Sequence, residues 1–298
     1  MIRDYIFLKM DSVGKTIHGA KYECLLFDMD DTLYPMSTGL NLACRKNIEG
    51  FMLQHLHMEE ADVPRLCLEL YKEYGTTMAG LKALGYEFDN DEFHAYVHGR
   101  LPYEVLKPDP ALRNLLLSLP QKRKIIFTNA DKAHTAQVLS RLGLEDCFEG
   151  IICFETLNPP LEPVADCNNV LDHGDAALTG GASEANATGL SLTDGRSFSS
   201  KSRVLCKPSV EAIEAAIRTA NIDPNKTIFF DDSVRNIASG KAAGLHTVIV
   251  GSSTLVPGAD HALRSIHNIK EALPEIWEGG GQIVQVIQPS AVATVILA

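Results

Sequence analysis

The 298-residue sequence has no apolar run close to the about 20 residues that a membrane-spanning helix needs. The apolar stretch at 291–298 is too short for this purpose. The first residues contain no apolar signal segment with a small-residue cleavage site, and Asp4 and Asp11 argue against an organellar transit peptide. We therefore expect no membrane association and a cytoplasmic protein, with the nucleus as an additional location. Met1 and Met10 are both candidate start sites.

Paired cysteine motifs and an excess of positive charge are also missing. None of the seven cysteines belongs to a C-x-x-C pair, so we expect reduced thiols rather than disulfides or a zinc site. The net charge of −11 argues against a nucleic-acid polymer or an anionic membrane as partner. A small anionic substrate would need a local positive site, supplied by a metal ion or a few lysines.

What the sequence does contain is an apolar run, residues 24–27, that ends in the carboxylates Asp28, Asp30 and Asp31. Such a run predicts a buried parallel strand whose carboxyl end lies at the sheet edge where ligands bind. On a regular strand Asp28 and Asp30 would share one face, and two adjacent carboxylates favour a divalent cation such as Mg²⁺. An EF-hand is excluded because Leu33 occupies the sixth loop position, which should be Gly. For this stretch alone, a solvated acidic turn is the alternative.

Apolar strands and helices alternate along the rest of the chain. Strands are expected at 124–129, 150–154, 227–233 and 246–250, and helices at 111–118, 133–142, 209–220, 234–243 and 269–277. Between the first two strands, helical periodicity predicts a helical insert. The alternation predicts an α/β fold with a Rossmann-like parallel sheet and helices on both faces.

Polar side chains follow several of these strands. They are Asp28 and Asp30, Thr128 and Asn129, and Asp231 and Asp232, and Lys207 joins them from a segment just before a helix. The carboxyl ends of parallel strands meet at one edge, so these groups together predict an active site rather than a solvated turn.

This set of side chains fits phosphoryl transfer. Asp28 is expected to be the nucleophile that forms an aspartyl phosphate, and Asp30 the general acid and base. Lys207, Thr128 and the Asn129 amide are expected to bind phosphoryl oxygens. The expected ligands of a Mg²⁺ cofactor are Asp28, the Asp30 main-chain carbonyl, Asp231 and Asp232.

The motifs at 28–33, 128–129, 207–208 and 231–236 resemble, in order and spacing, the four motifs of the haloacid dehalogenase superfamily. The resemblance implies a Rossmann-like core with an α-helical cap between the first and second motifs. The expected division is an N-terminal extension (1–20), a core (21–36 and 105–275) interrupted by a flexible insert (158–203), a helical cap (37–104) and a C-terminal tail (276–298). The insert is inferred from its composition, which is rich in small and polar residues, and it departs from the family pattern. One departure is Asn236, where many members have Asp, and this puts an outer contact of the metal site in doubt.

Within the superfamily, the presence of Asp30 makes the chain resemble the phosphatases and phosphomutases. Segments 31–35, 74–77 and 101–103 are similar to pyrimidine 5′-nucleotidase-like members, which implies hydrolysis of nucleoside monophosphates such as UMP or CMP. The implied substrate-facing residues of the cap are Tyr74, Gly75, Thr76 and Thr77, for which an ordinary helix-breaking turn is the alternative. Two other functions remain open: a phosphatase for another small phosphate such as a sugar phosphate, and a non-catalytic interaction protein.

Overall fold

The computed structural model describes residues 21–121, 123–160 and 204–278. Within them, six parallel strands form one sheet in the order β3-β2-β1-β4-β5-β6. The strands are β1 (Cys24–Phe27), β2 (Arg123–Phe127), β3 (Gly150–Ile152), β4 (Thr227–Asp231), β5 (His246–Val250) and β6 (His261–Leu263). The predicted α/β class with a parallel sheet is confirmed.

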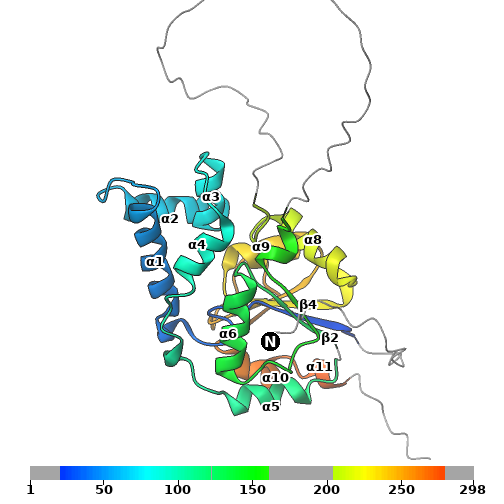
Figure 1. The fold of residues 1–298 in the computed structure, drawn as a ribbon. Coiled ribbons are helices and arrows are strands. Elements are labelled where there is room, and N and C mark those ends of the chain that lie inside the picture. The colour runs from blue at the N-terminus through cyan, green and yellow to red at the C-terminus, as the bar shows by residue number, and fades with distance from the viewer. Residues whose placement is uncertain (1–20, 122, 161–203, 279–298) are drawn as a thin grey trace, which may run out of the picture.

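Helices cover both faces of this sheet (Figure 1). Side chains alternate between the faces of a strand, so Leu25 and Phe27 join one apolar core and Cys24 and Leu26 the other. The first core includes α5 (Pro110–Ser118), α6 (Lys132–Leu142), α10 (Ile269–Ala272) and α11 (Glu275–Glu278). The second includes α8 (Val210–Ala220), beside which α9 (Val234–Ala242) packs. Burial on both faces explains the apolar runs within the central strands, at 24–27, 125–127, 228–230 and 248–250.

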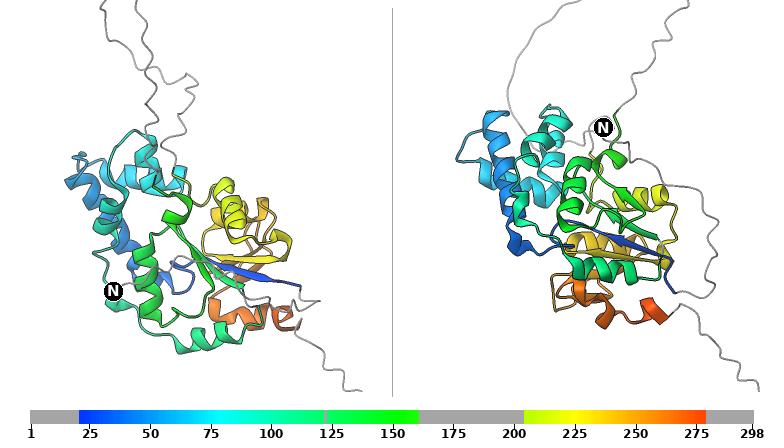
Figure 2. Two further views of the ribbon diagram at one scale, coloured as in Figure 1. Left: turned by 45° about the vertical axis from the view of Figure 1, so that its right-hand side comes forward. Right: turned by 60° about the horizontal axis from the view of Figure 1, so that its bottom comes forward.

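The chain between β1 and α5 forms a separate group of helices beside the sheet (Figures 1 and 2). We call this group the helical insertion: α1 (Leu40–Gln54), α2 (Val63–Tyr74), α3 (Thr77–Ala83) and α4 (Asn90–Val97). Its apolar cluster is centred on Phe51, Met52, Leu70 and Phe93, and Phe154 from outside the insertion also belongs to it. The predicted helical insert between the first two strands is therefore present.

Most predicted elements agree with the structure to within a residue or two, and three predictions need correction. The strand expected at 150–154 ends at Ile152, because Phe154 starts the short helix α7 (Phe154–Leu157). The helix expected at 269–277 is two short helices, since Pro274 lies between α10 and α11. Strand β6 was not predicted at all, as three residues are too few to show a period.

The predicted N-terminal extension (1–20), nearly all of the predicted insert (161–203) and most of the predicted tail (279–298) lie outside the described residues. Of the helices that the structure does describe, none combines the length and the apolar character needed to cross a membrane.

Candidate active site

The site lies at the carboxyl ends of the three central strands. Residue Phe27 of β1 is level with Ile126 of β2 and Phe230 of β4 in the parallel register. Asp28 extends the pairing by one hydrogen bond, from its N–H to the Phe230 carbonyl at 2.8 Å. The residues that follow these three strands therefore end at the same edge of the sheet.

The Lys207 side chain links groups from all three central strands at this edge. It is only 1% exposed, and its Nζ donates to Asp28 Oδ1 at 2.7 Å, to Asp231 Oδ2 at 2.8 Å and to the Phe127 carbonyl at 2.8 Å. An ammonium has three N–H donors, so all of them are used. A phosphoryl oxygen that binds Lys207 must replace one of these acceptors.

Asn129 holds the main chain of Lys207 in place. Its Oδ1 accepts from the Lys207 N–H at 2.8 Å, and its Nδ2 donates to the Lys207 carbonyl at 2.9 Å. The side-chain amide of Asn129 is thus engaged by the protein itself, which leaves its main-chain N–H as the group for the expected phosphate contact. Thr128 is buried beside it, and its hydroxyl oxygen accepts from the Ala130 N–H at 3.1 Å.

Three carboxylates converge on one point. Asp28, Asp231 and Asp232 each offer an oxygen within 4.8 Å of the others. Burial, with Asp231 nearby and Lys207 opposing, raises the pKa of Asp28 to about 7. Burial and the charges of Asp28 and Asp231 raise the pKa of Asp232 to about 8. One lysine does not balance this charge, and oxygen ligands of this kind suit a hard divalent cation such as Mg²⁺.

Asp30 is not one of these three carboxylates, and the strand geometry that was expected to place it on one face with Asp28 does not reach it. The strand ends at Phe27, and a turn follows in which Thr32 and Leu33 both donate to the Met29 carbonyl and Asp31 has a φ of 58°. Strand alternation therefore does not extend to Asp30.

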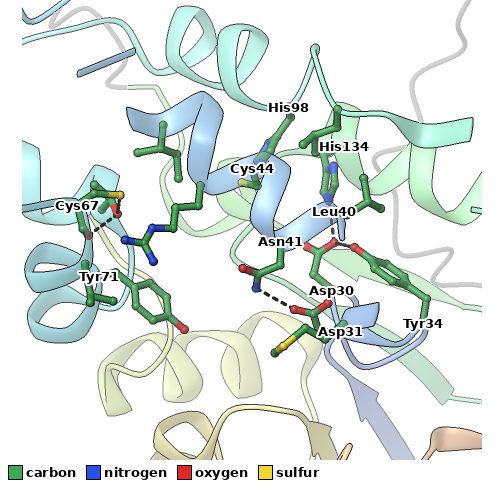
Figure 3. Close-up of a pocket in the computed structure, with 16 residues that line it drawn as sticks. Asp30, Asp31, Tyr34, Leu40, Asn41, Cys44, Cys67, Tyr71, His98 and His134 are labelled. Atoms are coloured by element: carbon green, nitrogen blue, oxygen red, sulfur yellow. Dashed lines mark hydrogen bonds and ion pairs between the residues drawn. The ribbon is translucent and has the colours of Figure 1, made fainter. Parts of the chain in front are cut away.

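Two side chains hold the carboxylate of Asp30, both at Oδ1 (Figure 3). Tyr34 donates its hydroxyl at 2.5 Å, and His134 Nε2 lies at 2.8 Å. His134 Nδ1 in turn lies 2.7 Å from the Tyr103 hydroxyl. Burial acts to raise the pKa of Asp30, but His134 and Tyr34 outweigh it, and the net pKa is lowered.

A cavity of about 400 Å³ opens between Asp30 and the helical insertion. Figure 3 shows Tyr71 of α2 across this cavity from Asp30 and Tyr34. The lining also includes Asn41 and Arg45 of α1, so polar and aromatic groups occur together in one wall.

The segment predicted to face the substrate, Tyr74 to Thr77, lies next to the site. Gly75 has a φ of 90°, and a Cβ there would be 2.4 Å from the Lys207 carbonyl oxygen. Thr76 accepts from the Ala79 N–H as the N-cap of α3. Thr77 lines the cavity but donates its hydroxyl to the Cys67 carbonyl at 3.0 Å. Within this segment, only Thr77 is part of the cavity lining.

The structure also brings in residues to which the sequence analysis gave no role, and it shows what Asn236, noted there only as a departure from the motif, contacts. Thr32 donates to Asp28 Oδ2 at 2.9 Å, and Asn236 donates to both oxygens of Asp231. Thr32 and Asn236 lie inside the quoted motifs, so their positions were available from sequence. His134 was not, because it is 104 positions from Asp30 and belongs to no motif.

The fold and this site define a parallel α/β protein with a lysine–carboxylate centre at the carboxyl edge of its sheet. Residues 199–250 match the sequence profile of the family described as haloacid dehalogenase-like hydrolase. This match covers only a short part of the chain, and over that part the chain is similar to the haloacid dehalogenase-like hydrolases, in agreement with the resemblance of its motifs.

The individual proteins that are similar to this chain either match only part of it or share a low sequence identity with it. The chain is 33% identical over 132 residues to Phosphate metabolism protein 8 of Saccharomyces cerevisiae, a match that covers 42% of this chain and 41% of the relative. Less than half the length of that curated relative is therefore matched. The crystal structure of CbbY from Rhodobacter sphaeroides in complex with phosphate has a TM-score of 0.50 and 14% identity, over 86% of this chain and 99% of that one. A putative β-phosphoglucomutase from Thermotoga maritima has a TM-score of 0.46 and 20% identity, over 85% of this chain and 99% of that one.

Proposed function

We propose that this protein is a Mg²⁺-dependent phosphomonoester hydrolase that acts through an aspartyl phosphate and prefers nucleoside 5′-monophosphates. One observation carries the proposal. Asp28, Asp231 and Asp232 offer oxygens within 4.8 Å of one another, and the Lys207 ammonium contacts the first two. Three anionic ligands and one cation around the end of a strand are what the transfer of a charged phosphoryl group requires.

The donor set fits Mg²⁺ by its chemistry, because all three candidate ligands are carboxylates. Asp28, Asp231 and Asp232 would hold the ion, together with the main-chain carbonyl of Asp30. When bound, it would neutralise charge on the phosphoryl oxygens.

The protein groups divide the remaining work. Lys207 and Thr32 each bind one oxygen of Asp28, which orients the carboxylate and leaves a lone pair to attack phosphorus. Asp30 has its Oδ1 occupied by Tyr34 and His134, so its Oδ2 is the atom for proton transfer. It would protonate the leaving oxygen and then take a proton from the water that hydrolyses the aspartyl phosphate.

The low pKa of Asp30 keeps it ionised before substrate arrives. An anionic phosphate close to this carboxylate raises its pKa through like-charge repulsion, so that Asp30 takes up a proton from solvent when the substrate binds and can then donate it to the leaving oxygen.

The cavity supports the nucleotide preference. Its volume of about 400 Å³ falls in the range of small-molecule sites, and it begins at Asp30, where the leaving group would stand. The Tyr71 ring offers a surface for a planar base, and Asn41 and Arg45 offer polar contacts.

A panel of phosphomonoesters tests the proposal. We expect Mg²⁺-supplemented protein to release phosphate from UMP and CMP faster than from ribose 5-phosphate or glycerol 3-phosphate. EDTA should stop the reaction, and added Mg²⁺ should restore it. Asp28→Asn protein purified in the same way controls for a contaminating phosphatase. Release from no compound would overturn the hydrolase, as expected for a non-catalytic interaction protein, while equal rates for sugar phosphates would overturn the nucleotide preference alone.

A further inference from the structure

Arg235, on α9, reaches across to the helical insertion. Its Nη1 donates to two carbonyls in the last turn of α2, those of Tyr71 at 3.0 Å and Lys72 at 2.7 Å. Its guanidinium carbon also lies 4.6 Å from the centre of the Tyr71 ring. A cation at this end of a helix satisfies exposed carbonyls and complements the negative end of the helix dipole.

Two further contacts bring the end of α2 to the catalytic edge. Gly75 packs on the Lys207 carbonyl, where only a residue without a Cβ fits. Cys206 Sγ lies 3.4 Å from the Tyr74 carbonyl. Of these contacts, the one made by Arg235 is the only one that also touches a side chain of the cavity wall, that of Tyr71.

Helix α9 contacts both the carboxylate cluster and the helical insertion. Asn236 binds Asp231 in the carboxylate cluster, and its neighbour Arg235 binds α2. Successive residues of an α-helix point in directions about 100° apart, so one turn of α9 can serve the carboxylates and the insertion at once. Residue Tyr71 remains 46% exposed beside the guanidinium, so part of it stays open to a ligand in the cavity.

We propose that Arg235 is a positioning residue for substrate selection. It holds the last turn of α2 on the core and orients the Tyr71 ring, against which a planar ring of the leaving group packs. The proposal rests on the proposed hydrolase function and adds one claim to it. The preference for a leaving group that carries a ring depends on Arg235, which belongs to the α/β part of the protein and does not touch the substrate.

UMP and ribose 5-phosphate are suitable probes, because they share the phosphorylated sugar and differ in the base. The measured quantity is the ratio of kcat/KM for UMP to kcat/KM for ribose 5-phosphate. In Arg235→Ala we expect this ratio to fall by about tenfold, mainly through the KM for UMP, because a cation–π contact and two charge-assisted hydrogen bonds are lost. Arg235→Lys should recover part of it, since an ammonium can still reach a carbonyl.

A double-mutant cycle with Tyr71→Ala separates positioning from general damage. If Arg235 acts through Tyr71, the two losses in the ratio should be strongly non-additive. Arg218→Ala is the matched control, because Arg218 is 67% exposed on α8 and pairs only with Glu214 in its own helix among the ion pairs of the described chain. Additive effects, or an equal fall for both substrates, would overturn the proposal.

Amide hydrogen exchange gives a readout that does not need activity. In Arg235→Ala the amides of residues 71–77 should exchange about ten times faster than in the unmutated protein, and Arg218→Ala should not change them. Unchanged exchange in Arg235→Ala would overturn the anchoring of α2. If the unmutated protein hydrolyses no phosphate ester, the proposed function fails, and the exchange measurement still decides whether Arg235 anchors α2.

Discussion

Asn236 donates its side-chain amide to both carboxylate oxygens of Asp231, at 2.9 and 3.1 Å. This was the position at which the motif departs from the Asp of many superfamily members. The amide orients Asp231 by donating to it, whereas a second carboxylate would repel it. The departure therefore leaves Asp231 held in place.

Removal of this contact should weaken metal binding. In Asn236→Ala the Asp231 carboxylate loses two hydrogen bonds, and we expect the Mg²⁺ concentration for half-maximal activity to rise about 10- to 100-fold. A Mg²⁺ titration of phosphate release measures this. Asn268→Ala, which removes a half-buried amide that donates to Glu271 rather than to Asp231, is the control. An unchanged Mg²⁺ requirement would show that Asn236 does not support the metal site.

Replacement of Asp28 and replacement of Asp30 should impair different steps of the reaction. Asp28→Asn should reduce turnover by more than about 10⁴-fold, because an amide is a poor nucleophile and a poor metal ligand. Asp30→Asn should slow turnover by about 10²- to 10⁴-fold but still form the aspartyl phosphate from a substrate with a good leaving group, such as p-nitrophenyl phosphate.

Mass spectrometry of acid-quenched protein can detect that intermediate as one added phosphoryl group on the peptide that contains Asp28. Asp91→Asn, an exposed carboxylate on α4, controls for loss of charge alone. Equal and mild effects of Asp28→Asn and Asp30→Asn would contradict the division of roles.

The stability of the metal-free protein should depend on pH in a defined direction. The folded-state pKa of Asp28 is raised to about 7 and that of Asp232 to about 8, so the folded protein binds these protons more tightly than the unfolded chain. Their stabilising contribution is complete below pH about 4, the unfolded value, and is lost as the pH rises through the two folded-state values.

We therefore expect the Tm of EDTA-treated protein to fall between pH 6 and pH 8. The rise in Tm on adding Mg²⁺ should be larger at pH 8, where fewer protons must leave the carboxylates. Calorimetry at the two pH values measures both effects. Asp232→Asn should flatten the pH dependence, and a larger Mg²⁺ effect at pH 6 would contradict the assignment.

Replacing Gly75 by a residue with a side chain should be harmful for two reasons: its positive φ and its close approach to Lys207. Both Gly75 and Gly85 have a φ of 90°, but a Cβ at Gly75 would meet the Lys207 carbonyl at 2.4 Å, whereas Gly85 faces open space. Both alanine variants should lose about 1–2 kcal/mol from the strained backbone. Gly75→Ala should lose further stability and also activity, because the main chain of Lys207 must shift.

Thermal unfolding and kcat of the two alanine variants separate these effects. If Gly75→Ala matches Gly85→Ala in both measurements, the contact with Lys207 affects neither stability nor turnover.

The periodicity of the sequence was sufficient to place the central strands and most helices, because β1, β2, β4 and β5 each contain at least three consecutive buried apolar residues. It failed where elements are short. Strand β6 has three residues, and α10 and α11 have four each, too few for a period to appear. It also failed at Asp30, because strand alternation was extended past Phe27 into a turn.

By itself the sequence determined which residues end the central strands, and so that Asp28, Thr128 and Asp231 meet at one edge of a parallel sheet. Only the tertiary structure decided which atoms touch there: that Lys207 bonds Asp28 and Asp231, that His134 holds Asp30, and that Arg235 reaches α2. The physical reason is the separation along the sequence over which each kind of interaction acts. Strand and helix patterns repeat over a few neighbouring residues, whereas these contacts join residues 24 to 179 positions apart, and packing alone brings them together.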